Sequence, residues 1–116
     1  MIAAISRFTI SVAELDRSLP LYENVLGLTR RYALPGLAML AAANDVEVLL
    51  HERPPTPGDA GVAPTFRVDD VDAATADALL AGATIIDEPA DQPWGERQSV
   101  LHDVDGHVVC LVAPLG

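Results

Sequence analysis

Residues 5–28 read ISRFTISVAELDRSLPLYENVLGL, and this stretch decides the fold because a strand pattern is followed directly by a helix pattern. From Ile5 to Val12, apolar and polar residues alternate, as they do in a strand with one buried face. The apolar face of this predicted strand consists of Phe8, Ile10 and Val12. The opposite, more polar face consists of Arg7, Thr9 and Ser11.

A helix is predicted immediately after this strand. Its apolar stripe is formed by residues at helical spacing, namely Leu15, Leu19, Tyr22 and Leu26. Asp16 or Ser18 is expected to cap the helix start, which places Pro20 in the first turn, and Gly27 is expected to end the helix. The stripe should cover the apolar face of the strand.

Three short apolar segments follow and predict an antiparallel meander. They are Leu28–Leu34, Leu37–Ala42 and Val46–Glu52. Turn-forming pairs, Pro35-Gly36 and Asn44-Asp45, separate them. The first half of the chain is therefore predicted to be one βαβββ module.

The same order of patterns recurs after a segment rich in Pro and Gly. The predicted elements are a strand at Thr65–Val68, a helix opening at Asp70-Val71-Asp72 and ending at Gly82, and strands at Ala83–Asp87, Arg97–His102 and His107–Val112. Aligning Val12 with Val68 superimposes the two patterns, which indicates internal duplication. We expect a single α+β domain over 1–116, with a first half at 1–53, a linker at 54–61 and a second half at 62–116.

Composition narrows the range of partners. The chain has 116 residues, with seven Lys and Arg against 17 Asp and Glu, for a formal net charge of -10. This charge argues against nucleic acid and anionic membranes as partners, and it suits either a solvated surface or attraction of a cationic ligand. No segment has the length and apolarity of a bilayer span, and Cys110 is the only cysteine, so a reducing cytoplasmic location is expected.

Six stretches together resemble the vicinal oxygen chelate superfamily, which includes glyoxalases, extradiol dioxygenases and bleomycin-resistance proteins. They are Val12–Leu19 and Leu21–Leu28 in the first half, and Phe66–Asp72, Gly82-Ala83, Pro93–Arg97 and Asp103–His107 in the second. Each stretch alone is common, but their order and spacing are specific. The resemblance implies two tandem βαβββ modules whose curved mixed sheets form a cleft, often completed by a second chain in a homodimer.

The resemblance also implies four positions for the ligands of a divalent metal, usually His, Glu or Gln. The two first-strand positions fall on Arg7 and Ala63, which offer no useful lone pair. The last-strand position falls on Cys110, and the fourth falls on Glu47, or on Leu49 if that strand slips by two residues. We therefore expect no metal cofactor.

The three histidines do not supply the missing ligands. His51 ends a predicted strand, and His107 follows a turn beside Asp103 and Asp105. His102 is expected to be a strand residue in partly polar surroundings. Cys110 is more typical of an inert buried thiol than of a nucleophile.

The predicted faces provide a candidate small-molecule site instead. Its polar members are Arg7, Thr9, Ser11, Glu47, Thr65, Arg67, Arg97, His102 and Cys110, together with Trp94 in a loop expected at Pro89–Gly95. Arg7 and Arg67 would bind a carboxylate or phosphate on the ligand, or alternatively form internal salt bridges with Glu47 or other acids. Trp94 would stack over a planar ligand or anchor the rim of the dimer, and Arg97 beside it would do either.

Three function classes follow from these residues and this resemblance. The first is a metal-free binding protein resembling the bleomycin-resistance branch, which sequesters a drug-like or metabolite ligand in a dimer cleft. The alternative is a lyase, isomerase or dioxygenase with an atypical active site that uses groups such as Glu47 and His102. A third possibility is a structural module whose cleft is filled by its own side chains.

Overall fold

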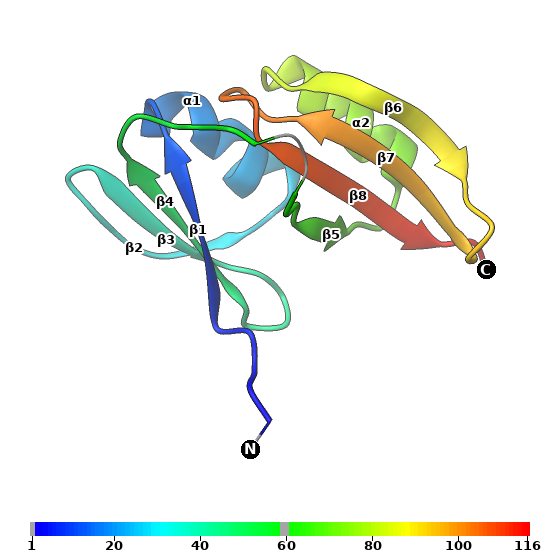
Figure 1. The fold of residues 1–116 in the computed structure, drawn as a ribbon, viewed down its shortest axis with the longest axis horizontal. Coiled ribbons are helices and arrows are strands. Elements are labelled where there is room, and N and C mark those ends of the chain that lie inside the picture. Colours follow the sequence, from blue (N-terminus) through cyan, green and yellow to red (C-terminus); the bar gives the residue numbers. More distant parts are fainter. Residues whose placement is uncertain (1, 59–60) are drawn as a thin grey trace. The chain divides into compact units, whose positions relative to one another are not determined.

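Two compact units, Met1–Thr56 and Pro57–Gly116, make up the chain in a computed structural model that describes residues 2–58 and 61–116. The boundary between the units falls within the predicted linker 54–61, of which residues 59 and 60 lie outside the described part. Each unit contains one four-stranded mixed sheet and its own helical segment (Figure 1). The α+β class and the two tandem βαβββ modules are confirmed.

The first unit has the strand order β1-β4-β3-β2. Its elements are β1 (Arg7–Val12), α1 (Leu15–Leu19), η1 (Pro20–Val25), β2 (Thr29–Leu34), β3 (Leu37–Ala41) and β4 (Glu47–Glu52). β1 and β4 run parallel, whereas the β4–β3 and β3–β2 pairs are antiparallel. The alternation predicted for the first strand is confirmed, since Ile10 and Val12 are buried while Arg7 and Thr9 are exposed.

The helix of the first unit differs from the prediction. It is α-helical only to Leu19 and then widens into the π-helical segment η1, in which the N–H of Leu26 donates to the carbonyl of Leu21. This wider turn rotates the buried face, so the buried side chains include Ser18 and Leu21 beside Tyr22. The predicted stripe is therefore wrong in part, because its other members, Leu15, Leu19 and Leu26, are only half-buried.

The cap predicted for this helix is also wrong. The helix begins at Leu15, so Asp16 lies in the first turn and Ser18 is buried within the helix. The backbone N–H of Leu15 donates to Oε2 of Glu52, the last residue of β4, at 2.9 Å. The partner of the helix start thus comes from a distant strand. Gly27 does end the helical segment, with φ 69, a conformation that favours glycine.

The second unit repeats this topology with the strand order β5-β8-β7-β6. Its elements are β5 (Thr65–Arg67), α2 (Val71–Leu80), β6 (Thr84–Asp91), β7 (Glu96–His102) and β8 (Val108–Pro114). β5 and β8 are parallel, and the other pairs are antiparallel. Helix α2 lies along one face of this sheet (Figure 1). Asp70 caps α2 by accepting a hydrogen bond from the N–H of Ala73, so the helix opens within the predicted stretch Asp70-Val71-Asp72.

One boundary in the second unit corrects the sequence analysis. The strand β6 continues past the predicted end at Asp87 to Asp91, so the loop before Glu96 is only Gln92–Gly95 rather than Pro89–Gly95. Pro89 is tolerated because β6 is the edge strand of its sheet, where a missing N–H removes no necessary ladder bond. The pairing of β6 with β7 shifts register twice, which also suits an irregular edge.

Each sheet buries apolar side chains against the helical segment of its own unit. In the first unit these include Val12, Leu40, Val48 and Leu50, with Tyr22 from η1. In the second unit they include Leu101, Val109 and Leu111, with Val71 and Ala78 from α2. Within the described part of the chain, no helix is long and apolar enough to cross a membrane.

Candidate functional site

Each sheet has one face that its own helices do not cover, and we call these the first and second open faces. The first open face contains Arg7, Thr9 and Ser11 of β1 and, directly beside them on β4, Glu47, Leu49 and His51. The register pairs Arg7 with Glu47 and Thr9 with Leu49. The intervening residues Val48 and Leu50 are buried on the helix-covered face. The structure thus brings four predicted site residues, Arg7, Thr9, Ser11 and Glu47, onto one face.

Glu47 does not pair with Arg7, the internal partner that the sequence suggested. Its Oε2 instead accepts a hydrogen bond from Nη1 of Arg31 at 2.9 Å. Nη2 of Arg31 also binds Oδ1 of Asp45 at 3.1 Å, so one guanidinium bridges two carboxylates. Arg31 sits where β2 bulges against β3, between the paired positions of Arg30 and Tyr32.

Ser11 is engaged by a residue that the sequence analysis did not consider. Nε of Arg53, just beyond β4, donates to Oγ of Ser11 at 2.6 Å. The Ser11 hydroxyl is therefore oriented by the chain itself. Thr9, two residues earlier on the same face, is exposed.

The second open face contains Thr65 and Arg67 of β5, Cys110 and Val112 of β8, and Gln98, Val100 and His102 of β7. Cys110 lies at its centre, level with Thr65 on one side and with Val100 on the other. His102, Arg67 and Gln98 occupy diagonal positions around it, close enough for long side chains to interact across a sheet. The structure therefore groups the four predicted residues Thr65, Arg67, His102 and Cys110.

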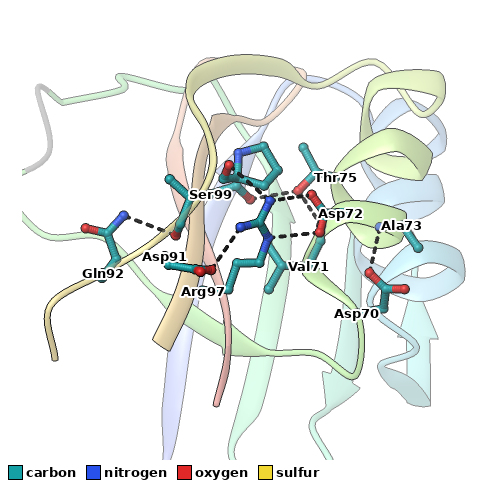
Figure 2. Close-up of polar contacts among 11 residues, drawn as sticks. Asp70, Val71, Asp72, Ala73, Thr75, Asp91, Gln92, Arg97 and Ser99 are labelled. Carbon is teal, nitrogen blue, oxygen red and sulfur yellow. Dashed lines mark hydrogen bonds and ion pairs between the residues drawn. The ribbon is translucent and has the colours of Figure 1, made fainter. Parts of the chain in front are cut away.

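Arg97 lies on the opposite, helix-covered face of the second sheet. Figure 2 shows its guanidinium between α2 and β6: Nε and Nη2 bind the carboxylate of Asp72 at 2.9 and 3.0 Å, and Nη1 binds Asp91 at 2.9 Å. The hydrogen bond from Arg97 lowers the pKa of Asp72, and the two carboxylates raise the pKa of Arg97. Arg97 is thus bound within its own unit, away from the other predicted side chains of β5, β7 and β8.

Trp94 lies at the tip of the β6–β7 hairpin and is 60% exposed. Its indole Nε1 donates to Oε1 of Glu96 at 2.9 Å. The loop is further tied to the C-terminal segment, because the N–H of Leu115 donates to the carbonyl of Gly95. The indole is held by its polar edge while its ring remains accessible.

The positions that the superfamily resemblance assigns to metal ligands do not form a donor set. Cys110 is level with Thr65, which corresponds to Thr9 in the first module, and Thr9 is level with Leu49. Internal equivalence therefore selects Leu49 rather than Glu47 as the counterpart of Cys110. With Arg7 and Ala63 at the first-strand positions, one thiol is the only soft donor among the four. Among residues 2–58 and 61–116 there is no group of three His, Cys, Asp or Glu side chains placed to hold a metal ion.

Several residues that shape these faces were not singled out from the sequence. Arg31 and Arg53 act on the first open face by holding Glu47 and Ser11, and Gln98 extends the second. The alternation of β7 around His102 could have identified Gln98. The partners of Arg31 and Arg53 depend on a bulge and on strand neighbours far apart in the chain, which periodicity does not report.

Comparison with known proteins defines the class. The sequence pattern of the Glyoxalase/Bleomycin resistance protein/Dioxygenase superfamily matches residues 4–111, so the chain belongs to this superfamily. A relative from Mycobacterium tuberculosis, named "Putative glyoxylase CFP32", is 38% identical over 107 residues, which are 85% of this chain and 40% of that protein. The chain therefore spans about two fifths of the length of this curated relative.

Solved structures agree on the fold. A glyoxalase/bleomycin resistance protein/dioxygenase family enzyme from Burkholderia phytofirmans superimposes with a TM-score of 0.83 at 22% identity, covering 97% of this chain and 100% of that one. TnmS3, an antibiotic binding protein from a Streptomyces species, has a TM-score of 0.73 at 28% identity, covering 97% of each chain. The first comparison, at 22% identity, supports the fold alone.

Proposed function

We propose that this chain is a metal-independent small-molecule-binding module of the superfamily, in which an open sheet face holds a drug-like or metabolite ligand. The observation that carries the proposal is the replacement of the metal-ligand positions by Arg7, Ala63, Leu49 and Cys110. Such a set does not meet the requirement for several converging lone pairs. The open faces keep instead the hydroxyl, guanidinium and amide groups that orient organic ligands.

The likeness to TnmS3 supports the same reading. That protein is an antibiotic binding protein, and it resembles this chain over 97% of both lengths. The homodimer that the superfamily resemblance implies remains part of the proposal, with Trp94 as a candidate contact because its ring is largely exposed. Sedimentation velocity tests the dimer directly, and a Trp94→Ala variant tests the tryptophan's part in it.

The binding function is tested with chelator-treated protein. Thermal shift followed by calorimetry against a panel of antibiotics and metabolites should yield at least one ligand that binds this protein. Its affinity should be the same with and without added Zn²⁺, Mn²⁺ or Fe²⁺. Absence of any ligand, or binding that requires the metal, contradicts the proposal.

The competing function is a lyase, isomerase or dioxygenase activity, and the name of the mycobacterial relative favours it. Glu47 and His102 are the acid–base groups that it would use, on the first and second open faces respectively. Elemental analysis of protein purified without chelator separates the two functions. A stoichiometric metal favours the enzyme, whereas a ligand bound unchanged in metal-free protein favours the binding module.

A further inference from the structure

The chain has seven arginines, and five of them are held by side chains of their own unit. The pairs are Arg17 with Glu14, Arg30 with Glu23, Arg31 with Asp45 and Glu47, Arg53 with Ser11, and Arg97 with Asp72 and Asp91. Over residues 2–58 and 61–116, Arg7 and Arg67 alone among the arginines make no side-chain hydrogen bond or ion pair. These two belong to the first strands of the two modules and lie on the open faces.

Arg7 lacks a partner although a carboxylate lies beside it. Glu47 is directly level with Arg7 on the neighbouring strand, about 4.8 Å away in an ordinary sheet. The Glu47 carboxylate is nevertheless bound to Arg31, which also binds Asp45. Arg31 thus removes the natural internal counter-ion of Arg7 and leaves the Arg7 guanidinium free on an exposed face.

Among the described residues, Arg67 also lacks a side-chain partner, but for a different reason. Asp69 and Asp70 follow it in the sequence, but within the described residues neither carboxylate pairs with it. Asp70 is committed to the N-cap of α2 through the N–H of Ala73 at 3.0 Å. The side chains level with or diagonal to Arg67 on the neighbouring strand β8 are Val112 and Cys110, and neither is an acidic residue.

Free guanidinium groups are unexpected in a chain with 17 acidic residues. A guanidinium presents a planar fork of donors that matches a carboxylate, sulfonate or phosphonate, and exposed threonine hydroxyls stand two residues from each, at Thr9 and Thr65. We propose that the open faces of this chain bind organic anions, with Arg7 as the counter-ion on the first open face and Arg67 as the counter-ion on the second. This inference rests on the proposed binding function and specifies the chemistry of its ligand, in contrast to the cationic ligand that net charge alone suggests.

Two dyes with a related aromatic body test this assignment. Anilinonaphthalene sulfonate carries the anion, and phenylnaphthylamine lacks it. The protein should bind the sulfonate more tightly than the neutral dye, and Arg7→Gln/Arg67→Gln should weaken sulfonate binding about tenfold while leaving the neutral dye within twofold. The single variants apportion the effect between the two faces, and Arg7→Lys/Arg67→Lys should recover part of it because the charge is kept.

The control variant Arg17→Gln/Arg30→Gln removes the same net charge from two ion-paired arginines and should leave both affinities unchanged. Equal losses of sulfonate binding in the two double variants would overturn the inference, since net charge would then explain the effect. Tight binding of the neutral dye with no preference for the sulfonate would overturn the anion assignment and leave the binding function standing. Failure of both dyes and of the antibiotic and metabolite panel would overturn the inference and the binding function together.

Discussion

Thr75 of α2 and Ser99 of β7 share a buried hydrogen bond of 2.8 Å that joins the helix of the second module to its sheet. The Thr75 hydroxyl also donates to the carbonyl of Val71 at 2.6 Å, and a hydroxyl has one proton to give. Ser99 must therefore donate to Thr75. The two residues are not equivalent in this pair, because Thr75 keeps a partner when Ser99 is lost, whereas Ser99 does not when Thr75 is lost.

The first prediction follows from this asymmetry. Ser99→Ala should lower the free energy of unfolding by about 1 kcal/mol, the usual net value of one hydrogen bond. Thr75→Val, which keeps the shape of the side chain, should cost about 1–3 kcal/mol because the buried Ser99 hydroxyl is left without an acceptor. Urea denaturation measures both. Equal losses, or a larger loss in Ser99→Ala, would contradict the direction assigned to this bond.

The ion pair between Asp72 and Arg97 predicts a dependence of stability on pH. Arg97 lowers the pKa of Asp72 in the folded chain, so the folded pKa lies below the unfolded value of about 3.9. The contribution of the pair is then complete above that value and is lost as the pH falls through the folded pKa. Asp72→Asn should lower the Tm at pH 7, and the difference from the unaltered protein should shrink once the pH is below about 3.9. Asp87→Asn, which changes an exposed carboxylate of β6, is the control and should show no such convergence.

The third prediction concerns the start of the first helix. Glu52→Ala removes the carboxylate that accepts from the N–H of Leu15, and by analogy with an N-cap it should cost about 1 kcal/mol. Hydrogen exchange should quicken first at α1 and η1 rather than in the second module, since the bond is local to the first. Asp16→Ala, at the residue that the sequence suggested as the cap, should have the smaller effect. The opposite ranking would favour the cap predicted from the sequence.

The sequence predicted the modules well because their signals are local. Alternation along β1, the opening of α2 near Asp70 and the helix end at Gly27 each depend on a few neighbouring residues. The change from α1 to η1 was not predictable in this way, because it depends on which carbonyl, four or five residues back, each N–H reaches. The cap from Glu52 depends on a residue 37 positions away.

The candidate site shows the same division between local and distant information. Alternation placed Arg7, Thr9, Thr65 and Arg67 on polar faces, where the structure has them. It did not assign a face to Arg97, which pairs with Asp72 across the helix-covered side. The choice between Glu47 and Leu49 as the counterpart of Cys110 likewise required the observed strand register.

The last prediction concerns Arg31, which acts on the ligand through another residue. Arg31→Gln releases the Glu47 carboxylate beside Arg7, and the freed carboxylate should then pair with the Arg7 guanidinium. Competition of this kind between exposed charges is worth a fraction of a kcal/mol to about 1 kcal/mol, so sulfonate-dye binding should weaken about threefold. The variant Arg31→Gln/Glu47→Gln removes the competing carboxylate and should restore the affinity, although Arg31 is still missing. Fluorescence titration of the two variants measures the difference. Equal affinities in both would show that Arg31 does not keep Glu47 away from Arg7, because only one of them retains the carboxylate that could compete.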